Sequence, residues 1–247
     1  MTFDEIEAHL RYSYSLGSRF VDFEGGEVML WHDGDKRIND LIDLAKKIGF
    51  FSTTITTNAQ LPFPGIHADS IWVSLDGLGK YHDEIRGEGA FERLEKNIAT
   101  ANHPHLSVNM VINSLNYKSV DETLEYVKNS PYIESISFNF HTAFPGTEYL
   151  TLDKQIRKET IEKIIRYKKN GYPIMNTKTG LKKMIDCNFK KRCWITNFVY
   201  PNGLRGNCVY ENSDACNNCG FCMAGEMAAV FNLAPETIMA GFKLRTT

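Results

Sequence analysis

Six cysteines gather near the carboxyl end of the sequence, and thiols are its most distinctive reactive groups. The first 186 of the 247 residues contain none, and all six lie between Cys187 and Cys222. A disulfide scaffold would spread its bridges through a small secreted domain. A late, dense group of thiols instead predicts a metal site.

Five of the thiols follow two regular spacings, and thiolates suit iron–sulfur clusters and zinc above other metals. Because the five lie within 30 residues, they can approach one centre at little loop-closure cost. On thiol count alone, an iron–sulfur cluster and a structural zinc site remain equally open. Cys187 is either a sixth ligand or a plain free thiol. The pattern is C-x9-G-x4-C followed by C-x2-C-x2-C, made by Cys193, Gly203, Cys208, Cys216, Cys219 and Cys222.

A glycine pair ends the first strand that the sequence predicts, in the run Phe23-Glu24-Gly25-Gly26-Glu27. In parallel β/α folds, ligands bind beyond the carboxyl ends of the strands. Two glycines allow the backbone to come close to a ligand, and Glu27 adds a carboxylate. Taken alone, the pair is more often a simple turn.

A second polar segment follows another predicted strand, as Val73-Ser74-Leu75-Asp76-Gly77 and then His82 to Gly87. Ser74 and Asp76 can hydrogen-bond ribose hydroxyls, and Arg86 can pair with a carboxylate. The alternative is a solvated loop with an Asp-Gly turn.

The elements that position these residues alternate between buried strands and amphipathic helices, which predicts a parallel sheet covered by helices. The segment 58–69 is rich in proline and predicts a loop. Phe3, Ile6 and Leu10 predict a helix at the very start, whereas β/α proteins usually begin with a strand. We therefore expect a first strand and its loop to be missing. The predicted strands are Arg19–Glu24, Phe50–Thr56, Ser70–Leu75, Leu106–Asn113 and Glu134–Phe140.

The order and spacing of these segments resemble the radical S-adenosylmethionine (SAM) superfamily, over nearly the whole chain. The resemblance implies a partial (β/α)6 TIM-like barrel without its first strand in residues 1–180. It also implies that Gly25, Gly26 and Glu27 hold the SAM amino group, and that Ser74 and Arg86 contact its ribose and carboxylate. Thr57 and Asn58 match a SAM- or substrate-facing position less securely.

The cysteine region, residues 181–247, resembles the SPASM or Twitch domains of the same family, which hold auxiliary 4Fe-4S clusters. The full SPASM pattern continues as C-x2-C-x5-C-x3-C with a further cysteine. Here only two residues separate Cys219 from Cys222, where the full pattern has five, and no cysteine follows Cys222. The resemblance therefore implies one cluster with a spare thiol among the five ligands, Cys193, Cys208, Cys216, Cys219 and Cys222.

The implied function is reductive cleavage of SAM to a 5′-deoxyadenosyl radical, which abstracts hydrogen from a peptide, protein or small-molecule substrate. Flavodoxin or ferredoxin would be the electron donor. The catalytic cluster of the family needs C-x3-C-x2-C before the first helix, and residues 1–186 have no cysteine. We expect this chain alone to be inactive; a late annotated start, a gene fragment and a degenerate paralogue all remain open. The rival hypothesis is a non-catalytic iron–sulfur or zinc-binding module.

Bulk composition excludes two classes of partner. The formal net charge of −2 argues against electrostatic binding to nucleic acid or an anionic membrane. No apolar run approaches the roughly 20 residues that a membrane span needs, and residues 1–20 carry charges throughout. We therefore expect a cytoplasmic protein.

Overall fold

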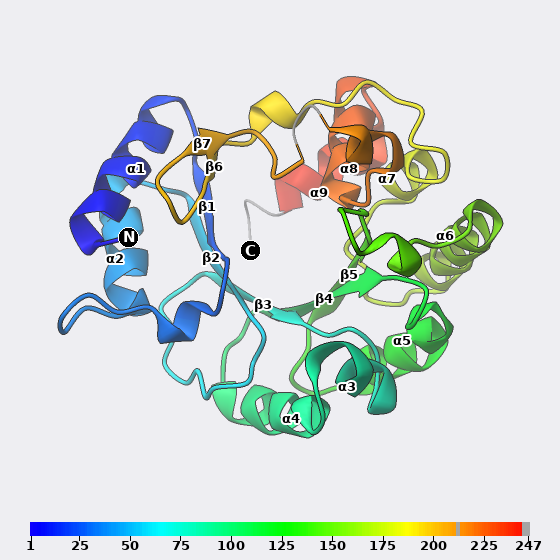
Figure 1. Ribbon diagram of the computed structural model, residues 1–247, viewed down its shortest axis with the longest axis horizontal. Helices are drawn as coiled ribbons and strands as arrows, with labels where there is room; N and C mark the ends of the chain where they lie inside the picture. Colours follow the sequence, from blue (N-terminus) through cyan, green and yellow to red (C-terminus); the bar gives the residue numbers. More distant parts are fainter. Residues whose placement is uncertain (211–212, 244–247) are drawn as a thin grey trace.

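The computed structural model describes residues 1–210 and 213–243. Its centre is a five-stranded parallel sheet whose strand order follows the chain, β1 to β5 (Figure 1). All five predicted strands are confirmed, with ends within two residues of the predicted ones. Their bounds are β1 Phe20–Phe23, β2 Ser52–Thr57, β3 Ser70–Ser74, β4 Leu106–Ile112 and β5 Ser135–Phe140.

Helices cover the outer side of the curved sheet (Figure 1). The predicted loop at residues 58–69 is confirmed, since no helix separates β2 from β3. No helix in the described ranges is long and apolar enough to cross a bilayer. The helices before residue 178 are α1 Phe3–Ser15, α2 Ile38–Ile48, α3 Lys80–Arg86, α4 Ala90–Ala101, α5 Val120–Asn129 and α6 Lys154–Lys169, with short 3-10 turns η1 Val28–Leu30, η2 Tyr117–Ser119 and η3 Glu148–Leu150.

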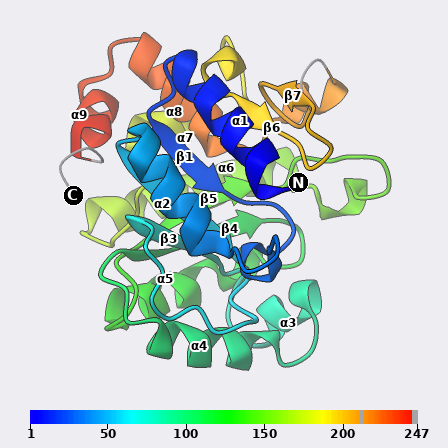
Figure 2. The ribbon, with the colours of Figure 1, turned by 90° about the vertical axis from the view of Figure 1, so that its left-hand side faces the viewer.

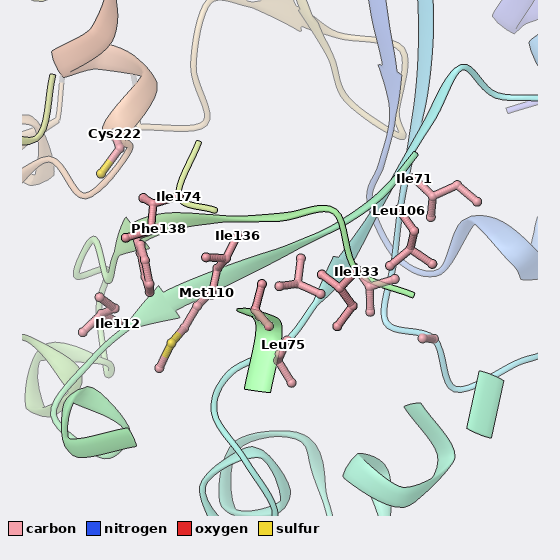
Figure 3. Packing of buried hydrophobic residues seen from close by; sticks show 14 of the residues in the cluster. Ile71, Leu75, Leu106, Met110, Ile112, Ile133, Ile136, Phe138, Ile174 and Cys222 are labelled. Atoms are coloured by element: carbon pink, nitrogen blue, oxygen red, sulfur yellow. The ribbon is translucent and has the colours of Figure 1, made fainter. Parts of the chain in front are cut away.

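Each strand presents an apolar face to the helices and a more polar face to the concave side of the sheet. Buried apolar residues recur at every second position along the central strands. Examples are Ile71 in β3, Met110 in β4 and Phe138 in β5, which form one core with the helices (Figure 3). The intervening positions keep some solvent exposure. The concave face is therefore lined by Asp22, Thr54, Thr56, Ser70, Trp72, Ser74, Asn109, Ser137 and Asn139.

Helix ends follow local sequence signals, with one correction. Gly49 ends α2 in the left-handed conformation at φ +113°, as its position after the apolar face predicts. The sequence Ser119-x-x-Glu122 predicts a capping box at α5. The helix does begin there, but the Ser119 hydroxyl donates to the Glu122 carboxylate at 2.7 Å and accepts from the Leu78 amide at 3.2 Å. Ser119 therefore joins α5 to the loop after β3.

The curved sheet and its outer helices form an incomplete ring. The carboxyl-terminal segment lies across the open side of this ring (Figures 1 and 2). Its β6–β7 hairpin packs on α1, where the Arg205 Nε donates to His9 Nδ1 at 3.1 Å and the guanidinium lies 3.7 Å from the Tyr12 ring centroid. Trp194 lies in a 3-10 turn before the hairpin. The elements are α7 Lys178–Lys183, η4 Cys193–Ile195, β6 Phe198–Val199, β7 Arg205–Gly206, η5 Asp214–Asn218, α8 Cys222–Phe231 and α9 Pro235–Lys243.

The other end of this segment docks on β5. The Gly220 carbonyl accepts from the Phe140 amide at 2.8 Å, and the Gly220 amide donates to Thr142 Oγ1 at 2.8 Å. The Cys222 amide donates to Asn139 Oδ1 at 2.8 Å. The predicted boundary at residue 180 falls within α7, and the hydrophobic core continues through it to Leu181.

We expect Gly220→Ala to weaken this docking, because a Cβ there would lie 1.7 Å from the Phe140 carbonyl oxygen. Overpacking of this kind costs about 1–3 kcal/mol of unfolding free energy, measured by urea denaturation. Gly241→Ala is the matched control. Its Cβ would meet nothing within 4 Å, and alanine favours the α9 helix by about 0.5–1 kcal/mol. Equal stability of the two variants would contradict the docking role.

Candidate functional site

The glycine pair after β1 requires glycine for its backbone conformation. Gly25 and Gly26 have φ +92° and +57°, in the left-handed region that side chains disfavour. A Cβ at either position would meet nothing within 4 Å. The loop backbone therefore faces open space at the carboxyl edge of the sheet, where a ligand can approach it.

Glu27 joins this loop to the end of β2. Its Oε1 accepts from the Thr57 hydroxyl at 2.7 Å and the Met29 amide at 3.1 Å, and its Oε2 accepts from the Asn58 amide at 2.8 Å. The structure thus brings together Glu27, Thr57 and Asn58, all of which the sequence singled out. A carboxylate accepts about four hydrogen bonds, so one position on Oε2 stays available to a ligand.

Asp76 is directed into the protein. It is 2% exposed, and its Oδ1 accepts from the Val111 amide at 3.1 Å, while its Oδ2 accepts from Arg86 Nε at 2.7 Å. Both carboxylate oxygens therefore bind groups within the protein. In this orientation the Asp76 side chain does not face a ribose, contrary to the prediction from the sequence. Asp76 instead fixes Arg86 and ties the loop after β3 to β4.

Arg86 and Ser74 retain groups that can bind a ligand. Arg86 is held through Nε alone, its side chain is 31% exposed, and no other described residue binds its terminal nitrogens. Ser74 ends β3 on the concave face, with no side-chain partner among the described residues. These two residues and the glycine loop share one edge of the sheet without touching each other.

His82 lies on the buried side of the loop after β3 and binds it. It is fully buried, and burial lowers its pKa, so the imidazole is neutral. Its Nδ1 accepts from the Asp76 amide at 3.1 Å, which places the ring proton on Nε2. That Nε2 has no partner in the described part of the chain.

A pair of acids on the concave face was missed by the sequence reasoning. Asp22 is exposed to solvent on the concave face, but the protein around its carboxylate desolvates it, and this desolvation, together with the nearby Glu24 charge, raises its pKa to about 7. Thr56 Oγ1 donates to Asp22 Oδ2 at 3.1 Å. The alternation of strand residues is the signal that would have placed Asp22 on this face.

Three of the six thiols are buried, those of Cys187, Cys219 and Cys222. Burial, with smaller effects of the nearby Cys187 and Cys193 thiols, raises the pKa of the Cys219 thiol to about 11. Cys216 Sγ lies 3.3 Å from the Tyr210 carbonyl. Within residues 1–210 and 213–243, no three metal-binding side chains converge tightly enough to hold a metal ion. The donor chemistry fits zinc or an iron–sulfur cluster, but the five predicted ligands do not share one centre in this conformation.

No protein-family model matches the sequence, and no curated protein sequence is similar to it. Among solved structures, native anSMEcpe with bound AdoMet (SAM) and Cp18Cys peptide is similar in fold. It has a TM-score of 0.55 and 14% sequence identity, over 74% of this chain and 58% of that one. The chain thus spans less than two thirds of that structure. The likeness and the parallel sheet confirm the α/β, partial-barrel class.

We expect Asp76→Asn to lower the free energy of unfolding by about 2 kcal/mol, because it removes a buried, charge-assisted hydrogen bond to Arg86. Urea denaturation at neutral pH measures the change. Asp43→Asn, which breaks an exposed pair with His67, should change stability by at most about 0.5 kcal/mol. If Asp76→Asn loses no more unfolding free energy than Asp43→Asn, the hydrogen bond between Asp76 and Arg86 contributes little to stability.

The raised pKa of Asp22 predicts a pH dependence of stability. The native state holds the proton more tightly than the unfolded chain, whose pKa is near the ordinary 3.8. This contribution is fully present below pH 4 and disappears as pH rises to about 7. Asp22→Asn should therefore flatten the fall in unfolding free energy between pH 4 and 7, as measured by urea titrations. Parallel pH profiles for the variant and the wild type would contradict the assignment.

Proposed function

We propose that this protein binds SAM at the carboxyl edge of the sheet and is related to the radical SAM enzymes, with the chain alone inactive because residues 1–186 supply no cysteine for the SAM-binding cluster. The observation that carries the proposal is the fold that it shares with anSMEcpe, a radical SAM enzyme whose structure contains bound AdoMet. The open glycine loop and the available groups on Ser74 and Arg86 lie at the strand ends where such folds bind ligands. They supply the accessible ligand-binding edge that this proposal requires.

Each residue at this edge has a distinct part in binding. The Gly25-Gly26 backbone approaches the ligand, and the remaining acceptor position on Glu27 receives an N–H of the SAM ammonium group. The Ser74 hydroxyl binds the ribose, and the terminal nitrogens of Arg86 bind the SAM carboxylate. Asp76 positions Arg86 through its Nε. A reduced four-iron cluster beside SAM would supply the electron that generates a 5′-deoxyadenosyl radical, and its cysteine ligands would have to come from outside residues 1–186.

The substrate occupies the concave face in this proposal. Its polar lining, including Asp22 and the Asn109–Asn139 pair joined at 3.0 Å, offers hydrogen bonds to a peptide or a small polar molecule. The solved structure similar in fold contains a peptide, which favours the peptide class. Cys222 touches the same face through Asn139, so an auxiliary cluster there would anchor the substrate or accept an electron from it. A flavodoxin- or ferredoxin-like carrier would supply the electron for SAM cleavage.

We expect the chain to bind SAM in isothermal titration calorimetry, and Arg86→Gln to weaken that binding about tenfold by removing a charge-assisted hydrogen bond. Ser74→Ala should weaken it less. Arg11→Gln is the control, because Arg11 lies on the surface of α1, where it pairs with Glu7. Far-UV circular dichroism confirms that each variant is folded.

Equal affinities of the Arg86 and Arg11 variants would remove Arg86 from the site. Absence of SAM binding in the wild type, together with one zinc per chain, would replace the enzyme proposal with the metal-binding module.

A further inference from the structure

Asn116 lies in the loop after β4, directly before η2, and its side chain is fully buried. Its Nδ2 donates to the Asp76 carbonyl at 3.1 Å and to the Val111 carbonyl at 3.0 Å. Its Oδ1 accepts from the Asn113 amide at 2.8 Å. One side chain therefore joins the loop after β3 to the end of β4, although it takes no part in the site proposed above.

Asp76 is the residue that this side chain holds, and all four of its polar groups have partners. Asn116 binds its carbonyl, and Nδ1 of His82 accepts from its amide at 3.1 Å. Its carboxylate accepts from the Val111 amide at 3.1 Å and from Arg86 Nε at 2.7 Å. These partners come from α3, from β4 and from the loop after β4. Asp76 therefore cannot turn without breaking several hydrogen bonds, and the orientation of Arg86 depends on it.

His82 is better explained by this hydrogen bond than by packing. Its side chain is 0% exposed, and its Nε2 has no partner in the part of the chain that the structure describes. A buried N–H without a partner is unfavourable, and leucine would fill a similar space without one. The feature that leucine cannot supply is the acceptor that Nδ1 presents to the Asp76 amide.

Arg86 is the side chain that gains from a fixed Asp76. Only its Nε is bound by another described residue, and its side chain is 31% exposed. Without that bond, the long side chain would occupy many rotamers. Ordering it only when a ligand binds would weaken affinity by about two- to tenfold. With Nε fixed, the terminal nitrogens keep one direction and can receive a carboxylate.

We propose that Asn116 and His82 are positioning residues for recognition of the ligand's carboxylate. By holding the carbonyl and the amide of Asp76, they keep the Arg86 guanidinium in its binding orientation before the ligand arrives. Neither residue touches the ligand. This inference rests on the proposed SAM site, and it adds the residues that set the preference of that site for a ligand with a carboxylate.

A comparison of two ligands measures this preference directly. SAM and decarboxylated SAM share the adenine, the ribose and the sulfonium, and they differ in the carboxylate that Arg86 binds. Isothermal titration calorimetry on the full chain gives the ratio of their affinities. We expect Asn116→Ala to weaken SAM binding about threefold and to leave binding of the decarboxylated ligand nearly unchanged. The ratio of the two affinities therefore falls.

Asn176→Ala is the matched control. Asn176 is a buried asparagine too, 6% exposed, and it exchanges hydrogen bonds of 2.7 and 3.0 Å with the Phe138 backbone. Both alanine variants should lower stability in urea, since each breaks buried hydrogen bonds. Only Asn116→Ala should change the affinity ratio. A ratio that changes equally in both variants, or in neither, would overturn the proposal.

Variants of His82 separate its acceptor from its volume. His82→Leu removes the acceptor, whereas His82→Asn keeps an oxygen near the position of Nδ1. We expect SAM affinity to fall in His82→Leu and to recover largely in His82→Asn. In an Arg86→Gln background, neither His82→Leu nor Asn116→Ala should weaken SAM binding further, because the residue that they position is gone. Additive losses would show that they do not act through Arg86.

A measurement without ligand keeps this inference separable from the proposed function. Nitrogen-15 NMR follows solvent exchange of the Arg86 Nε–H in the full chain. Exchange should be slow in the wild type and in Asn176→Ala, and faster in Asn116→Ala and His82→Leu. Absence of SAM binding by the wild type would overturn the proposed function. SAM binding by the wild type, with an unchanged ratio and unchanged exchange in Asn116→Ala, would overturn this inference alone.

Discussion

The structure depends on strands that are apolar on one face and polar on the other. Because the helices cover the outer face, β2, β3 and β5 bury every second residue there and leave the others on the concave side. Leu94, Leu124 and Ile161 of the outer helices pack on the same core as Ile55 and Val108 of the strands. The curved sheet thus supplies stability through its outer face. Its inner face stays available for polar chemistry.

Two carboxylates, one buried and one half-buried, hold the loops at the strand ends in fixed positions against the sheet. Glu27 fixes the loop after β1 to β2, and Asp76 fixes the loop after β3 to β4. Glu27 accepts from the Thr57 hydroxyl at the end of β2, and Asp76 accepts from the Val111 amide within β4, so each loop is held by the rigid sheet. Groups that could bind a ligand, such as the terminal nitrogens of Arg86, are thereby held in place before any ligand arrives.

Local sequence signals predicted the elements well and the individual side-chain roles less well. The strands, the loop at residues 58–69 and the end of α2 at Gly49 follow from patterns a few residues long. The inward orientation of Asp76 depends on Val111, 35 positions away, and no local spacing contains that information. Cysteine spacing likewise says nothing of the contact between Arg157 and Cys187. The proximity of Cys187 to Cys219 instead arises from α6 and α7 packing, which orders residues 157–187 against the carboxyl-terminal segment.

The contact between His9 and Arg205 joins residues 196 positions apart. It holds the β6–β7 hairpin on α1, at the open side of the ring. Such distant contacts form slowly, because a long chain segment must be ordered before they stabilise anything. During synthesis, the sheet and its outer helices emerge from the ribosome well before the segment that spans them. The concave face is therefore still uncovered in the nascent chain. The hairpin contact thus closes the ring only after the sheet that it spans can already fold.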